Sequence, residues 1–130
     1  MNPKSATVLI MDDDPVLSEL IACFLASAQI RAVMVMNGLT GVQQAHTLLP
    51  SLILCDSCMP GIDGLQVIEA LRSASATAHI PIVLMSGHAA ASFDGCGANA
   101  FLQKPFHMAE MVALVQRFVR QNILCHEPIA

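Results

Sequence analysis

Four short apolar runs in this chain each end in a polar residue. They are residues 7–11 before Asp12 and Asp13, 52–55 before Asp56, 80–85 before Ser86, and 100–103 before Lys104. Short apolar runs between helical stretches are typical of buried parallel strands, and the functional residues of an open parallel sheet gather where its strands end. We therefore expect three carboxylates, one hydroxyl and one ammonium group at one edge of a sheet. That set suits binding a divalent cation and accepting a phosphoryl group.

Strand-like and helix-like stretches alternate along the chain, which predicts a right-handed, doubly wound α/β sheet. The expected strands are 7–12, 30–36, 51–56, 80–86 and 100–104. The first expected helix begins at Asp14-Pro15, with Asp14 as N-cap and Pro15 in the first turn. The second covers 38–49 and ends before Pro50, and the third runs from the capping box of Asp63 and Gln66 to about residue 76. The last expected helix covers 107–122. A further helix between Ser86 and Lys104 has room for about two turns before two glycines, so we expect a short helix or a mobile loop there.

Apolar spacing predicts which helix faces are buried. In the first helix the buried stripe is Leu17, Leu20, Ile21, Phe24, Leu25 and Ala28, and the outer face is Val16, Ala22, Cys23 and Ala26. The last helix is expected to bury Met108, Met111, Val112, Val115, Phe118 and Val119.

Length and composition predict one domain, with a core over about 6–122, a tail at 123–130 and no output domain in this chain. The net charge of −4 provides no basic surface for nucleic acid. No apolar run approaches the ~20 residues of a membrane span, the N-terminus has no signal-peptide core, and five cysteines without such a signal favour reduced thiols. We therefore expect a cytoplasmic protein.

Charged residues are only 12% of the chain, so some exposed faces must consist of small or apolar residues. Such faces are either partner surfaces or an ordinary surface of small residues.

The three acids at the sheet edge are expected to require compensation. Two carboxylates about 4 Å apart repel by roughly 4 kcal/mol at an effective dielectric of 20. Bound Mg²⁺ or Mn²⁺ would relieve this repulsion, and Lys104 supplies a further positive charge. An aspartate can also act as a nucleophile toward phosphorus. Asp56 stands alone after its strand and is the better nucleophile, whereas the adjacent Asp12 and Asp13 are better suited to a metal.

Four segments carry a more specific pattern. They are 8–15 with Asp12-Asp13-Asp14-Pro15, 56–64 starting at Asp56, the pair Ser86-Gly87, and 97–106 with Lys104-Pro105. Together they resemble the response-regulator receiver domain of two-component signalling, in order and over essentially the whole chain. The resemblance implies a flavodoxin-like five-stranded parallel sheet with strand order 2-1-3-4-5.

The resemblance also implies a role for each site residue. Asp56 is the phosphoacceptor, and it binds Mg²⁺ together with Asp13 and the Cys58 backbone carbonyl, while Asp12 contributes through water. Ser86 is a hydroxyl that moves toward the phosphoryl group, and Lys104 is that group's ionic partner. The remaining implied features are Phe101 as an aromatic switch, a cis Lys104–Pro105 bond, and Cys58 and His88 as the positions that tune the phosphoryl lifetime.

The implied donor is a sensor histidine kinase or a histidine phosphotransfer protein, which we expect to dock beside the first helix. The implied output or homodimer face combines the fourth helix, the fifth strand and the last helix. Here that fourth-helix segment is about one turn shorter than is usual in the family, Ser86 stands in place of the commoner threonine, and Gly87 in place of alanine. Neither Cys58 nor His88 is an acid or amide that would position water, so the lifetime stays open. The chain is either a single-domain regulator or a piece of a longer protein.

Three other functions compete with this interpretation. A receiver-like module could bind a partner without phosphorylation, and failure to bind Mg²⁺ would favour it. A haloacid-dehalogenase-type phosphatase would use Asp12-x-Asp14 for catalysis, but Asp14 is better used as a helix cap and Asp56 is then unexplained. The Cys55-x-x-Cys58 spacing could indicate redox or zinc chemistry, but Cys55 is expected to be a buried apolar residue inside a strand. The chain is therefore not expected to be an enzyme beyond its own phosphorylation and dephosphorylation.

Overall fold

Five parallel strands form one sheet in the order β2-β1-β3-β4-β5. The computed structural model describes residues 6–88 and 93–126, with side chains to residue 121. The strands are β1 Thr7–Met11, β2 Arg31–Val35, β3 Leu52–Asp56, β4 Ile82–Ser86 and β5 Ala100–Gln103. All five expected strands are confirmed, with ends that differ by one or two residues. The order of the strands is the one that the resemblance implied.

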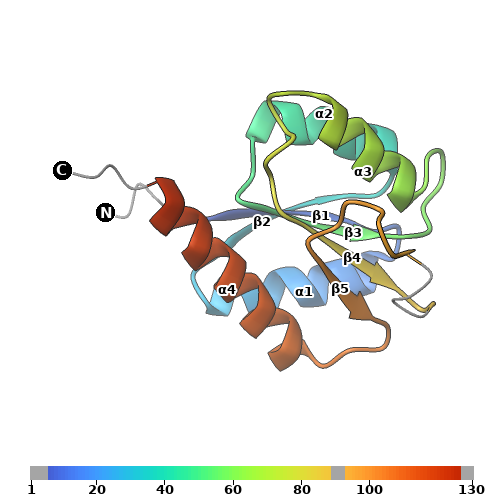
Figure 1. Ribbon diagram of the computed structural model, residues 1–130. Helices are drawn as coiled ribbons and strands as arrows, with labels where there is room; N and C mark the ends of the chain where they lie inside the picture. Colours follow the sequence, from blue (N-terminus) through green and yellow to red (C-terminus); the bar gives the residue numbers. More distant parts are fainter. Residues whose placement is uncertain (1–5, 89–92, 127–130) are drawn as a thin grey trace.

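Helices cover both faces of the sheet (Figure 1). They are α1 Pro15–Ser27, α2 Gly38–Leu48, α3 Gly64–Ser73 and α4 Met108–His126. Helices α1 and α4 lie on one face, and α2 and α3 lie on the other. Alternate residues of β1 point to opposite faces: Val8 and Ile10 join one buried cluster, whereas Leu9 and Met11 join the other. The doubly wound α/β fold is therefore confirmed.

The helix starts agree with the sequence. The Asp14 carboxylate accepts hydrogen bonds from the backbone N–H groups of Val16 and Leu17, with Pro15 in the first turn. Asp63 and Gln66 form a reciprocal capping box at the start of α3. Both caps satisfy backbone donors that a helix N-terminus leaves without partners.

The expected buried stripe of α1 is partly wrong. Leu20 and Phe24 are 44% and 43% exposed, whereas Ser18 is fully buried. Ala22, expected on the outer face, is half-buried against the core. The cause is the rotation of α1 on the sheet, which places Ser18, Ile21 and Leu25 inward and so turns the row that contains Leu20 and Phe24 toward solvent.

Two helix ends also differ from expectation. Helix α3 ends at Ser73 instead of about 76, because the buried Thr77 hydroxyl donates to the Leu71 carbonyl at 2.7 Å and closes the last turn. Helix α4 continues to His126, four residues past the expected end. Of its expected buried residues, Met111, Val115 and Val119 are buried and the other three are partly buried against the core.

The segment between β4 and β5 contains no α-helix in the part that the structure describes. Residues 89–92, where most of the expected short helix falls, lie outside the described residues. From Phe93 to Asn99 the chain forms turns, with left-handed backbone at Gly95 and Gly97. The two glycines therefore end regular structure here, as their conformational freedom predicts.

Candidate functional site

Three carboxylates converge where β1 and β3 end. Asp12 follows β1 and is fully buried, Asp13 is exposed, and Asp56 closes β3 with 6% of its surface exposed. One oxygen from each of the three side chains lies within 4.8 Å of the others. Strands β1 and β3 are hydrogen-bonded neighbours, with Met11 opposite Cys55, and this register brings the residues that follow them to one edge.

Lys104 reaches this acidic cluster from the end of β5. Its Nζ donates to Asp12 Oδ2 at 2.9 Å and lies 3.3 Å from Asp56 Oδ1. The Lys104 backbone N–H donates to the Ser86 carbonyl at 2.7 Å, which continues the ladder between β4 and β5 by one residue. One ammonium group therefore bridges two carboxylates that come from different strands.

Burial and the neighbouring charges shift the pKa values of Asp56 and Lys104. Burial, and next the charge of Asp12, raise the pKa of Asp56 above its ordinary value, although Lys104 acts in the opposite direction. Burial alone would lower the pKa of Lys104, but its hydrogen bond to Asp12 and the two negative charges raise it overall. The single ammonium group thus leaves the ionised form of Asp56 incompletely compensated.

Ser86 ends β4 as a buried hydroxyl with 1% of its surface exposed. Its Oγ accepts hydrogen bonds from the His88 backbone N–H at 3.0 Å and from the Ser57 hydroxyl at 2.8 Å. Ser57 was not among the residues singled out from the sequence. Its position directly after Asp56 could have indicated this contact, because the residue that follows one strand lies next to the end of the neighbouring strand.

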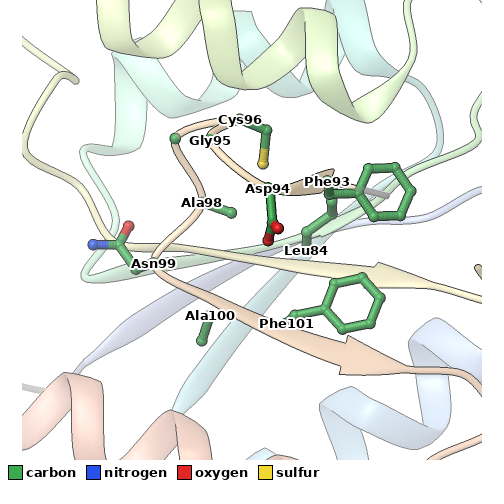
Figure 2. Close-up of a pocket in the computed structure, with 10 residues that line it drawn as sticks. Leu84, Phe93, Asp94, Gly95, Cys96, Ala98, Asn99, Ala100 and Phe101 are labelled. Carbon is green, nitrogen blue, oxygen red and sulfur yellow. The ribbon is translucent and has the colours of Figure 1, made fainter. Parts of the chain in front are cut away.

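Phe101 lies on β5 beside a second aromatic residue, Phe93. The ring centroids are 5.7 Å apart with an interplanar angle of 31°, and both side chains pack against the core cluster under α2 and α3. A pocket of about 250 Å³ is lined by Leu84 of β4, by Ala100 and Phe101 of β5, and by residues 93–99 before β5. Figure 2 shows Phe93 and Phe101 among the side chains that line it. The predicted switch residue therefore adjoins free space.

The other expected site residues lie at the rim. Cys58 and His88 are exposed, and the Cys58 backbone N–H donates to Asp56 Oδ1 at 3.4 Å. The Lys104–Pro105 bond is cis, as the resemblance implied. Cys55 is fully buried, and burial raises the pKa of its thiol, which opposes the thiolate that redox chemistry requires.

The donor set fits a small, hard divalent cation. Mg²⁺ prefers carboxylate and other oxygen ligands and retains several waters, so it needs a site that is open on one side. Here two carboxylates are buried and Asp13 is exposed, so the cluster faces solvent on the Asp13 side. A cation would also offset the incompletely compensated charge of Asp56.

Comparison with known proteins identifies the family. The model of the family described as "Response regulator receiver domain" matches residues 8–116, so this chain belongs to that family of two-component signalling domains. The chain is 35% identical over 119 residues to the DNA-binding dual master transcriptional regulator RpaA of Synechocystis sp., covering 88% of this chain and 49% of that protein. It is 31% identical over 132 residues to the response regulator PleD of Caulobacter vibrioides, covering 95% and 28%. The chain thus spans about half or less of these relatives.

Solved structures agree with this assignment. A crystal structure of a putative response regulator from Chloroflexus aurantiacus has a TM-score of 0.82 at 32% identity, covering 88% of this chain and 98% of that one. The receiver domain of the sensor histidine kinase PA1611 from Pseudomonas aeruginosa has a TM-score of 0.82 at 27% identity, covering 89% and 98%. That structure has a magnesium ion coordinated in its active site cleft. Receiver domains are signalling modules rather than conventional enzymes.

Proposed function

We propose that this chain accepts a phosphoryl group on Asp56 from the phosphohistidine of a sensor histidine kinase or histidine phosphotransfer protein, in a Mg²⁺-dependent reaction. The observation that carries the proposal is the Lys104 ammonium, held 2.9 Å from Asp12 and 3.3 Å from Asp56 in a cluster of three acids. Phosphoryl transfer depends mainly on positioning and on neutralising charge, and this cluster provides both.

In the proposed step, a carboxylate oxygen of Asp56 attacks phosphorus and forms an acyl phosphate. The P–N bond to the donor imidazole breaks, and that nitrogen leaves with the electron pair. Asp56 Oδ1 already accepts from the Cys58 N–H and faces Lys104, which favours Oδ2 as the nucleophile. Asp56 must be ionised to react, and the positive charge of Lys104 favours that form.

Mg²⁺ would be held by the Asp13 and Asp56 side chains and the Cys58 carbonyl, with Asp12 acting through water. When bound, it would supply positive charge to the phosphoryl oxygens. Lys104 would neutralise a second oxygen and the Ser86 hydroxyl would donate to a third. We propose that this donation draws Ser86 toward Asp56 and allows Phe101 to turn inward, reporting phosphorylation to a protein partner.

The proposed lifetime of the acyl phosphate depends on the two exposed rim positions. Cys58 and His88 are exposed at this end of the sheet, and neither is an acid or amide suited to position water.

We propose that the reaction takes place in the cytoplasm, and the cysteines in the described part of the chain are free thiols. In the part of the chain that the structure covers, no helix has the length and apolar character needed to cross a membrane.

The test is intact mass spectrometry with acetyl phosphate and Mg²⁺. Wild type should gain the mass of one phosphoryl group, and Asp56→Asn should gain none because it lacks the nucleophilic oxygen. Asp94→Asn, at an exposed position in the turns before β5 and not one of the three acids of the cluster, is the matched control and should behave as wild type. A wild-type chain that neither binds Mg²⁺ nor gains mass would favour the interaction module without phosphorylation. Turnover of a phosphate ester would favour the phosphatase interpretation. That interpretation requires Asp14 for catalysis, whereas the Asp14 side chain caps α1.

A second prediction concerns the donor. The residues at four-residue spacing on α1, Val16, Leu20 and Phe24, are 75%, 44% and 43% exposed and form an apolar row. Of the outer face expected from the sequence, Val16, Cys23 and Ala26 are exposed and Ala22 is half-buried, and the structure adds Leu20 and Phe24 to the exposed residues. We expect Phe24→Glu to slow transfer from a phosphorylated histidine donor at least tenfold, by placing a charge in an apolar contact. The rate with acetyl phosphate should not change. Equal slowing with both donors would contradict docking at α1.

A further inference from the structure

Two buried hydroxyl groups meet where β3 and β4 end. Ser57 Oγ donates to Ser86 Oγ at 2.8 Å, and the two residues are 7% and 1% exposed. The Ser57 backbone N–H donates to the Met85 carbonyl at 2.9 Å and extends the ladder by one residue. The backbone therefore holds Ser57 beside Ser86.

The contacts of Ser86 define which part of its hydroxyl is already used. A serine hydroxyl has two acceptor positions and one hydrogen to donate. Ser86 Oγ accepts from Ser57 Oγ and from the His88 N–H, so both acceptor positions are occupied. These contacts hold the oxygen on the side of Ser57 and leave its hydrogen for donation.

Moving Ser86 toward a phosphoryl group would separate this pair. The Ser57 hydroxyl would then lose its oxygen acceptor in a buried position, which is unfavourable. Its remaining neighbour is Cys58 Sγ at 3.9 Å, and a thiol sulfur is a weak acceptor. The loss is therefore only partly offset.

We propose that Ser57 is a positioning residue that holds Ser86 in its unphosphorylated arrangement and so opposes the switch. This inference rests on the proposed function, because it concerns the hydroxyl that would contact the phosphoryl group on Asp56. Ser57 touches neither the phosphoryl group nor the metal in this scheme. It acts only through Ser86.

The experiment measures how tightly the protein binds a phosphoryl mimic. Beryllium trifluoride with excess Mg²⁺ is titrated into ¹⁵N-labelled protein and followed by backbone amide NMR. Ser57→Ala removes the hydroxyl. Ser57→Val and Ser57→Thr form a matched pair that differs chiefly by the hydroxyl. Ser73→Ala is the control, because it removes an exposed serine hydroxyl that forms a hydrogen bond within α3. Urea unfolding establishes that each variant is folded, and Ser57→Ala alone suffices if the larger side chains do not fit.

Ser57→Ala and Ser57→Val should reach half-saturation at roughly fivefold lower mimic concentration than wild type, the effect of one net hydrogen bond lost from the resting arrangement. Ser57→Thr and Ser73→Ala should match wild type. The free-state His88 amide resonance should shift in the Ala and Val variants, because its acceptor Ser86 loses a partner. If wild type binds the mimic and Ser57→Ala binds it equally or more weakly, the inference is overturned while the proposed function stands. If wild type binds none, both are overturned.

Discussion

Asp56 is a carboxylate placed where its own charge is disfavoured. It is nearly buried, it shares a cluster with Asp12 and Asp13, and the Lys104 ammonium and the Cys58 N–H offset its charge only in part. Burial and Asp12 consequently raise its pKa. Reactive groups are often held in such environments, because an uncompensated charge is available for a ligand. This residue should therefore reduce stability in the absence of a cation.

The pH dependence follows from the sign of this shift. A carboxyl whose pKa is raised on folding contributes full stability below its unfolded pKa of about 4, and this contribution is lost as pH rises through the folded pKa. Asn at position 56 cannot ionise, so the variant keeps this contribution to stability as the pH rises. At pH 7 without Mg²⁺, Asp56→Asn should raise the free energy of unfolding, and the gain should vanish below about pH 4.

Urea unfolding across pH measures this difference. Asp94→Asn is the exposed control and should show little change at either pH. A variant less stable than wild type at pH 7 would mean that the contact between Lys104 and Asp56 outweighs burial and repulsion.

At the scale of elements, Arg72 connects three segments of the chain by hydrogen bonds. Its guanidinium makes five hydrogen bonds, which reach the carbonyls of Ala78, Ile80 and Gly97 and the Asn99 side chain. Asn99 Oδ1 also accepts from the Ile82 N–H at 2.9 Å. The end of α3, the start of β4 and the turns before β5 are thereby held together. Asn99 is therefore part of this structural network.

Removing this connection should destabilise the whole domain. We expect Arg72→Ala to lower the free energy of unfolding by about 1–2 kcal/mol, because one charged donor group that joins three segments is lost. Arg72→Lys should recover little, since an ammonium group cannot reproduce the planar fork of donors. Arg120→Ala, on the exposed surface of α4, is the control, and urea unfolding is the measurement. Equal midpoints for the Arg72→Ala and Arg120→Ala variants would rule out a structural role for the Arg72 contacts.

At the scale of the molecule, we expect the acidic cluster to couple cation binding to folding. The three acids come from two strands and meet only in the folded sheet, so Mg²⁺ binding should favour the folded state. The free energy of unfolding should rise with Mg²⁺ concentration, by about 2.7 kcal/mol at one hundred times the dissociation constant.

Asp13→Asn should flatten this dependence, and Asp94→Asn should not. Asp13 is exposed, so its replacement removes a proposed ligand without disturbing the core. Thermal unfolding at constant ionic strength separates specific binding from general screening of charge. Parallel Mg²⁺ curves for wild type and Asp13→Asn would contradict the proposed Mg²⁺ site.

The sequence by itself determined the strands, most helix boundaries, the caps at Asp14 and Asp63, and which acids, hydroxyl and lysine meet at one edge. These features follow from local periodicity and from the rule that parallel strands end on the same side. Only the tertiary structure decided the rotation of α1, which exposes Phe24 and buries Ser18, because apolar spacing leaves a helix free to turn through a residue or two. It also decided the partners of Ser57, Arg72 and Asn99. Their hydrogen bonds join segments far apart in the chain, and side-chain identity alone does not specify which distant group will lie within reach.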